Sequence, residues 1–275
     1  MLPDAQRARI DVVLVSPRNP LNMGAAARAM TNFGFSRLTV ARPYAPHWRE
    51  ARSAVGAPEL LSAATETATL AEAVAGCTLV AGTGTLTYRK PEQPVVSLPC
   101  LTPLVEREMG RGGRVALVFG PEKHGLTRED LSWCHVLVEI PTDLRQPSMN
   151  LGQAVAVCLY ELASRTIAGE AGAPGVAAAQ AAEKTREPRP AAPSGELDRL
   201  AGLIEESMIA AGYSPNSMQA ANRHDLRLML RRLAPTEPDT RRILRLFRRI
   251  LWRLNRASGK AGRNRDGAGK DSTKG

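Results

Sequence analysis

The chain has 275 residues, of which 43% are hydrophobic, and a formal net charge of +10. This length is enough for one α/β core and a smaller second unit, and no apolar run approaches the roughly 18 residues that suggest a membrane span. The four cysteines and four histidines are widely spaced and show neither zinc-ligand nor disulfide-framework spacing, so we expect reduced, buried thiols and no metal site.

Short apolar strands alternate with helices over residues 1–166. The N-terminal residues lack the apolar stretch of a signal peptide, so we expect a cytoplasmic protein. Strands are expected at residues 10–15, 37–40, 78–85, 114–120 and 135–142, and helices at residues 23–32, 69–76 and 150–166. This alternation predicts an α/β fold with a parallel sheet and helices on both faces. In such a sheet, ligands bind where the loops meet at the carboxyl ends of the strands.

The alternation stops after Thr166, and the composition changes. Residues 167–194 are rich in Ala, Gly and Pro, which predicts a flexible linker. Residues 195–256 contain three amphipathic helices, the last with a capping pair, Thr236 and Asp239, and an Arg-rich face. Residues 257–275 are expected to form a disordered tail. Residues 223–275 carry sixteen Lys or Arg and five Asp or Glu, against 21 and 22 in residues 1–222. Nucleic acid is therefore the first expected partner and an anionic membrane surface the second.

The segment VFGPEKHGLT, residues 118–127, follows an apolar strand and is similar to a nucleotide-binding P-loop. Gly120 and Gly125 have the spacing of the P-loop glycines, but Leu126 stands where the phosphate-binding Lys belongs. Without that charge, nothing neutralises the β- and γ-phosphates of a nucleotide. We therefore expect this loop to hold a ligand through backbone contacts.

Three further loops fall at expected strand ends. In PRNPLNMGAAARAM, residues 17–30, Arg28 can present its guanidinium to a phosphate, or it is an ordinary solvated helix residue. In AGTGTLT, residues 81–87, two glycines lack the third glycine of a dinucleotide fingerprint. In residues 140–157, Ser148 and Asn150 stand before the long helix, where they can cap it or leave N–H groups for a ligand.

Three of these segments, NMGAAARAM, VFGPEKHGLT and SMNLGQAVAV, occur in this order and about 95 and then 30 residues apart. Together they resemble the three motifs of the SPOUT RNA methyltransferases, and most of all those of the TrmJ-type tRNA 2′-O-methyltransferases in the TrmH-like group. The resemblance covers residues 10–166 strongly and residues 197–256 more loosely.

The resemblance implies an α/β domain with a C-terminal trefoil knot that binds S-adenosyl-methionine, usually in a homodimer. General topology rules exclude knots, so the knot follows from the resemblance alone. The implied cofactor-binding residues are Thr83, Gly84, Thr85, Gly120, Ile140, Ser148, Met149 and Asn150. The implied active-site residues are Arg28, the family's catalytic arginine, with Asn22, Glu122, Ser148 and Asn150. Many relatives carry an Arg soon after the Gly84 turn, where this chain has Thr85 and Leu86; Arg89 can substitute.

The implied reaction is methyl transfer to a ribose 2′-hydroxyl at position 32 of the tRNA anticodon loop, with rRNA and other tRNA sites as alternatives. Because a sulfonium methyl group is already activated, the enzyme must mainly align the hydroxyl. Arg28 stays protonated, so we expect it to clamp a phosphate and polarise the hydroxyl while a phosphate or water takes the proton. A non-catalytic RNA-binding module and a C-terminal helix lying on anionic lipid are the competing interpretations.

Overall fold

The computed structural model describes residues 2–44, 48, 56–84, 91–164 and 191–267. Its core is a seven-stranded sheet in which all neighbouring strands run parallel. The strands lie in the order β3-β2-β1-β6-β4-β7-β5, so the carboxyl ends of β6, β4 and β7 are side by side. Their bounds are β1 (Ile10–Val15), β2 (Arg37–Ala41), β3 (Thr65–Thr67), β4 (Leu79–Thr83), β5 (Val95–Ser97), β6 (Val115–Phe119) and β7 (Val136–Glu139).

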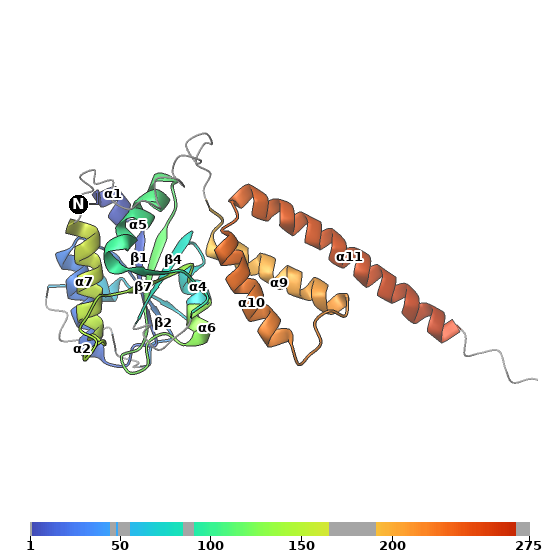
Figure 1. The fold of residues 1–275 in the computed structure, drawn as a ribbon, viewed down its shortest axis with the longest axis horizontal. Coiled ribbons are helices and arrows are strands. Elements are labelled where there is room, and N and C mark those ends of the chain that lie inside the picture. The colour runs from blue at the N-terminus through green and yellow to red at the C-terminus, as the bar shows by residue number, and fades with distance from the viewer. Residues whose placement is uncertain (1, 45–47, 49–55, 85–90, 165–190, 268–275) are drawn as a thin grey trace, which may run out of the picture.

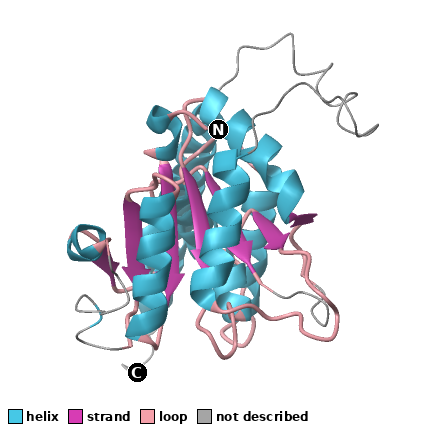
Figure 2. Ribbon diagram, turned by 90° about the vertical axis from the view of Figure 1, so that its left-hand side faces the viewer, coloured by secondary structure: helices cyan, strands magenta, loops and turns pink. Residues whose placement is uncertain are grey.

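Helices cover both faces of the sheet (Figure 1). Because successive strand residues point to opposite faces, Val12 and Leu14 belong to one apolar cluster, whereas Val13 and Val15 belong to another. The first cluster packs under α2 (Pro20–Asn32), α5 (Leu101–Gly110) and α7 (Leu151–Ser164), on the face that Figure 2 views. The second packs under α4 (Leu70–Val74) and α6 (Arg128–Leu131). Short helices α1 (Asp4–Arg7), α3 (Pro58–Ser62) and η2 (Leu98–Cys100) complete this part of the chain.

The strands expected from apolar runs are confirmed, as are the three helices between them. Helix α2 begins at Pro20, earlier than expected, because the Asn19 side chain caps it by accepting the Leu21 N–H and proline suits a first helical position. The sequence does not predict β3 and β5, since these three-residue edge strands are largely exposed and lack an apolar run. Cys100 is exposed, so the expectation of buried thiols is wrong there, although the other three cysteines are buried.

Three helices follow residues 165–190, which lie outside the described residues and contain most of the expected linker. They are α9 (Ser194–Ala210), α10 (Gln219–Leu233) and α11 (Glu237–Gly267). Leu200, Ile204 and Leu230 form a separate apolar cluster between them. The Thr236 hydroxyl accepts the Asp239 N–H at 3.4 Å, as the capping pattern predicts. Helix α11 continues past Arg256 to Gly267, where the sequence predicts a disordered tail; residues 268–275 are outside the described part.

The C-terminal helices lie against the α4 and α6 side of the sheet, and α11 extends away from it (Figure 1). The N–H groups of Ser194 and Gly195 donate to the carbonyls of Cys77 and Ala75, at 2.8 and 2.9 Å. The end of the expected linker, Ser194, is therefore fixed to the α/β domain, whereas the Ala192 N–H donates to the Pro235 carbonyl at 3.1 Å. None of the described helices has the length and apolar character needed to cross a membrane.

Candidate ligand-binding and active site

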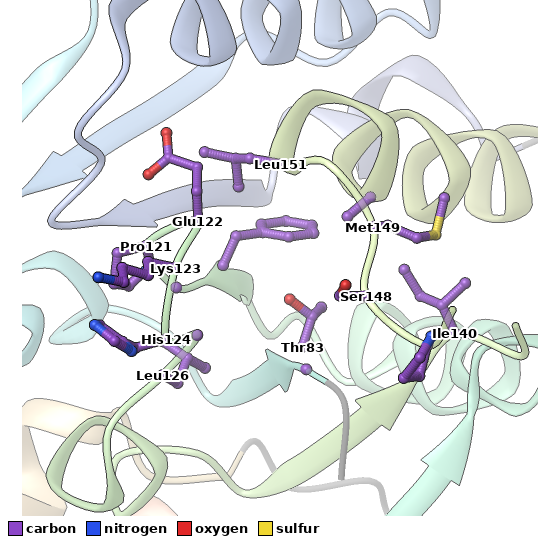
Figure 3. A pocket seen from close by; sticks show the side chains of 16 residues that line it. Thr83, Pro121, Glu122, Lys123, His124, Leu126, Ile140, Ser148, Met149 and Leu151 are labelled. Atoms are coloured by element: carbon purple, nitrogen blue, oxygen red, sulfur yellow. The ribbon is translucent and has the colours of Figure 1, made fainter. Parts of the chain in front are cut away.

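A cavity of about 250 Å³ lies at the carboxyl ends of β4, β6 and β7. The loop after β6 forms one wall, and the segment before α7 forms the opposite wall, with Thr83 between them (Figure 3). The cavity thus lies where a parallel sheet binds its ligands. Seven of the expected site residues line it, namely Thr83, Gly84, Gly120, Glu122, Ile140, Ser148 and Met149.

The loop from Gly120 to Thr127 is folded tightly onto itself. The Gly125 N–H donates to the Pro121 carbonyl at 2.9 Å, and Gly125 has a φ of +63°. A Cβ on Gly120 would lie 2.3 Å from backbone atoms of Gly125 and Leu126, so only glycine fits there. An N–H used in this turn cannot also cradle a phosphate, as a P-loop requires.

The surroundings of Leu126 explain why this position of the P-loop-like segment holds leucine and not lysine. Its residue exposure is 1%, and its side chain belongs to the apolar cluster under α4 and α6. A lysine at this position would place its charge in that core, where an unpaired ammonium is strongly unfavourable. The structure therefore supports the expectation that this is not a phosphate-binding loop.

A hydrogen-bonded network connects the three motifs at the rim of the cavity. The Glu122 carboxylate accepts from the side chain of Asn22 at 2.9 Å, and from the backbone N–H groups of Asn19 at 3.1 Å and Arg18 at 3.2 Å. The Asn150 side chain donates to Asn22 Oδ1 at 2.9 Å. Asn22 and Asn150 do not line the cavity, so their contribution is to hold Glu122 and the start of α7 in place.

The charge of Glu122 is stabilised by this network. Burial by itself would raise the pKa of Glu122, but the hydrogen bonds from Asn22 and the backbone outweigh it and hold the pKa below its ordinary value. Glu122 is therefore a carboxylate at neutral pH. It is an acceptor for N–H groups and has no tendency to act as an acid.

Asn150 also caps α7, as the capping interpretation predicts. Its Oδ1 accepts from the N–H of Gly152 at 2.9 Å and of Gln153 at 3.4 Å. A Cβ on Gly152 would lie 2.7 Å from the Cβ of Ala25, so glycine permits α7 to approach α2 closely. One side chain thus satisfies the helix terminus and connects it to Asn22.

The remaining walls combine hydroxyl and apolar groups. Thr83 is buried, and its hydroxyl donates to the Val118 carbonyl at 3.0 Å, which leaves its oxygen lone pairs toward the pocket. Thr83 and Ser148 lie close together in the centre of Figure 3. Gly84 has open space where a Cβ would be, so a ligand can approach the backbone there. The pocket therefore combines apolar and hydroxyl groups in its walls with the charged side chains of Glu122 and Lys123.

The structure does not bring Arg28 into this cavity. Arg28 is exposed on α2 and does not line the pocket, and Thr85, like Leu86 and Arg89, lies outside the described residues. Among described side chains, no group of three or more His, Cys, Asp or Glu could hold a metal ion. Lys123 lines the cavity beside Glu122, in the loop that the sequence predicts to hold a ligand. Several other lining residues lie inside the quoted motifs but have no role predicted from the sequence: Phe119, His124, Leu151 and Ala154.

A parallel sheet covered on both faces, with such a pocket at its strand ends, defines an α/β protein with a small-ligand site at the carboxyl edge of its sheet. Residues 9–160 match the SpoU rRNA Methylase family. This match covers more than half of the chain, and the chain belongs to that family.

Several known proteins are similar to this chain. The tRNA (cytidine/uridine/adenosine-2′-O-)-methyltransferase TrmJ of Pseudomonas aeruginosa is 42% identical over 163 residues, which cover 59% of this chain and 63% of that relative. The tRNA (cytidine/uridine-2′-O-)-methyltransferase TrmJ of Escherichia coli K12 is 33% identical over 250 residues, which cover 88% and 93%.

Solved structures resemble the chain in the same way. The crystal structure of TrmJ from Z. mobilis ZM4 matches with a TM-score of 0.74 and 27% identity, over 88% of this chain and 99% of that one. A putative methylase family protein from Neisseria gonorrhoeae matches with a TM-score of 0.55 and 33% identity, over 62% and 87%. The first match extends over both the α/β part and the C-terminal helices, because it covers nearly the whole length of both chains.

Proposed function

We propose that the protein is an S-adenosyl-methionine-dependent tRNA 2′-O-methyltransferase that acts on position 32 of the anticodon loop. The observation that carries this proposal is the network of Glu122, Asn22 and Asn150, which joins three motifs distant in sequence at the rim of one pocket. The family membership and the TrmJ relatives support the same activity. Other tRNA positions and rRNA are the alternative substrates.

The residues of the pocket fit S-adenosyl-methionine. Its adenine ring has apolar faces and polar edges, and its ribose carries hydroxyl groups. The pocket offers apolar side chains, Phe119, Ile140 and Leu151, beside the hydroxyls of Thr83 and Ser148. Its methionine part carries both signs of charge, and Glu122 and Lys123 supply both signs at the rim. The absence of a phosphate-cradling loop is consistent with a nucleoside ligand without phosphates.

In the proposed mechanism the chain binds and aligns, because the bound cofactor supplies an already activated methyl group on a sulfonium. The walls around Thr83 and Ser148 exclude water and fix the orientation of the adenosine, while Glu122 holds the loop after β6 against the start of α2. Arg28 clamps a phosphate next to the target ribose and polarises its 2′-hydroxyl. Its guanidinium stays protonated, so a phosphate or water accepts the proton.

This role of Arg28 requires a second subunit in our proposal. The Arg28 side chain is exposed and does not line the pocket of its own chain, and it makes no hydrogen bond or ion pair with another described side chain. Tyr160 of the adjacent α7 is 57% exposed and touches Phe33, just after the end of α2. We infer that the α2 and α7 face forms a homodimer in which Arg28 reaches the partner's pocket.

Two further family features belong to the proposal. The C-terminal part of the α/β domain would be tied into the trefoil knot that binds the cofactor. The C-terminal helices, with the Arg-rich face of α11, would form a basic domain that grips the tRNA backbone independently of sequence. Such a tRNA-modifying enzyme would work in the cytoplasm. A non-catalytic RNA-binding module and a lipid-bound α11 remain the competing interpretations.

Two tRNA transcripts test the proposed target. One contains only ribonucleotides, and the other carries a 2′-deoxynucleotide at position 32. We expect methyl transfer from labelled S-adenosyl-methionine to the first and none to the second. Equal labelling of both would exclude position 32. RNA-independent binding to anionic liposomes at physiological salt would instead favour the lipid-bound interpretation of α11.

A further inference from the structure

A second cavity, of about 500 Å³, lies between the α/β domain and α10. The part of the chain around α6 and the loop before it form one wall, and α10 forms another. Its lining includes the side chains of His124, Leu126, Arg128, Leu131, His224 and Leu228. The volume falls in the usual range for small-ligand pockets, about 300 to 1,000 Å³.

The α10 wall is held rigidly against the α/β domain by two buried arginines. The Arg227 guanidinium lies 4.0 Å from the centre of the Trp133 ring and donates to Ser132 Oγ at 2.9 Å and to Glu129 at 2.5 Å. Arg231 donates to the Trp133 carbonyl at 3.0 Å and to Ser194 Oγ at 2.9 Å. Residue exposure is 6% for Arg227 and 3% for Arg231. Buried guanidinium groups need such partners, so the two domains have a defined relative position.

The opposite walls are fixed as well. The Gln93 side chain donates to the Leu131 carbonyl at 2.6 Å, and Thr127 and Asp130 form a capping box at the start of α6. Arg42 pairs with Asp130 at 2.6 Å. The cavity therefore exists before any ligand enters, so binding carries no free-energy cost for ordering these walls.

The second cavity adjoins the first. His124 and Leu126 line both, so an occupant of the second cavity would lie next to the proposed cofactor. No residue of the proposed catalytic network lines the second cavity, which gives it a separate role.

The chemistry of the lining favours one kind of occupant. Leu126, Leu131 and Leu228 offer apolar surface, which suits the face of a planar ring. Arg128 offers positive charge and hydrogen bonds, which suit a phosphate, and the imidazoles of His124 and His224 add polar ring nitrogens. The Glu92 carboxylate also lines the cavity and can accept from a base amino group. The basic sequence after residue 222 adds a field that attracts a polyanion to this side.

We propose that the second cavity binds an unpaired nucleobase of the substrate RNA, from a nucleotide that flanks the methylated one. This proposal rests on the proposed function, since the flanking base is defined by the methylated nucleotide. Sequence-specific RNA recognition uses unstacked loop bases in this way. The cavity thus contributes to the choice of RNA, whereas the first pocket holds the methyl donor.

The test fills the cavity and measures RNA affinity. Leu228 is 7% exposed, and Leu228→Trp would occupy the space between α10 and α6. We expect this variant to bind a fluorescent tRNA transcript about tenfold more weakly by anisotropy, in line with the loss of one stacked base, and to bind S-adenosyl-methionine as the wild type does. The matched control is Leu233→Trp, because Leu233 is 65% exposed at the end of the same helix; it should bind the transcript normally.

His224→Ala is the second variant, in case the larger substitution disturbs folding. The His224 side chain is 15% exposed, and its Nδ1 lies 3.9 Å from a Glu129 carboxylate oxygen. Its removal should weaken RNA binding severalfold, and a single cooperative thermal transition will show that the variant is folded. Transcripts with an abasic residue on one side of the target should lose affinity for the wild type. With Leu228→Trp, the abasic residue should cause no further loss of affinity, because the tryptophan already fills the cavity.

Each outcome has a definite meaning. Wild-type RNA affinity in both variants would overturn the proposal, as would a loss of S-adenosyl-methionine affinity in Leu228→Trp with RNA affinity intact, which would assign the cavity to the cofactor. Additive losses from the abasic residue and Leu228→Trp would also overturn it. If the wild type transfers no labelled methyl but the affinity pattern holds, the proposed function fails and the nucleobase site remains.

Discussion

Replacing Glu122 with glutamine tests the network that joins the three motifs. The Glu122 carboxylate accepts three N–H groups, one from the Asn22 side chain and two from the backbone of Asn19 and Arg18. A carboxamide has the same shape, but only one of its two terminal atoms accepts hydrogen bonds. In Glu122→Gln at least one of these donors would therefore face an NH₂ group.

The expected size of the effect follows from the geometry. A hydrogen bond to a charged group contributes about 1.5 to 3 kcal/mol, but Glu122 is exposed enough for water to compensate much of this. We therefore expect the interactions that hold the loop after β6 in place to weaken by about 1 to 2 kcal/mol. At about 1.4 kcal/mol for each factor of ten, kcat/KM for methyl transfer should fall roughly tenfold.

The assay is methyl transfer to tRNA at varied RNA and cofactor concentrations. Glu59→Gln is the matched control, because Glu59 is exposed on α3, away from the pocket. If Glu122→Gln keeps kcat/KM within twofold of the wild type, the network does not position the active site. A double-mutant cycle with Asn22→Ala should show coupling between the two side chains.

Four other predictions follow from single positions. In Gly120→Ala, a Cβ 2.3 Å from the facing backbone should displace the loop and weaken S-adenosyl-methionine binding at least tenfold by calorimetry, whereas Gly76→Ala, where a Cβ meets nothing within 4 Å, should not. Arg28→Lys loses the bidentate fork, so turnover at saturating tRNA should fall about tenfold or more; near wild-type turnover would exclude the clamp. Burial, with Arg231 nearby, lowers the pKa of His135 to about 3. Below pH ~6.5, His135 therefore becomes protonated in the unfolded chain but stays neutral in the folded chain. The free energy of unfolding should fall as pH drops from 6.5, by up to ~1.4 kcal/mol per pH unit from this group, and urea titrations of His135→Gln should lack that part of the slope. Cys100 is the exposed cysteine, so a thiol reagent should modify it first in the native protein; equal reaction of all four thiols would contradict the buried positions of the others.

The central part of the fold can be predicted from the sequence because its signals are local. β6 is a continuous apolar run and β1 is one apart from Asp11, as is typical of strands buried on both faces. The edge strands β3 and β5 have three residues each and expose most of them, so no pattern identifies them. Their strand conformation depends on pairing with β2 and β7.

The candidate site could be predicted only in part. Gly120, Thr83 and Ser148 lie at the pocket as the motifs imply, but spacing alone cannot show that Asn22, Glu122 and Asn150 touch, because 100 or more residues separate the partners. The resemblance to a family supplied that grouping.

The sequence does not predict how the C-terminal helices dock. Their basic charge predicts a surface for RNA, yet Arg227 and Arg231 are buried against Trp133. Their pairing spans almost one hundred residues, and nothing in the helical pattern distinguishes a buried arginine from a solvated one. This docking creates the wall of the second cavity.

The central claim is that the chain methylates a ribose of tRNA. Its most direct test incubates the purified protein with S-adenosyl-methionine carrying a labelled methyl group and with total tRNA or rRNA, followed by digestion and mapping of the labelled nucleoside. We expect the label in tRNA, in a 2′-O-methylated nucleoside. Absence of label from both RNAs, or label on a base instead of a ribose, would contradict it.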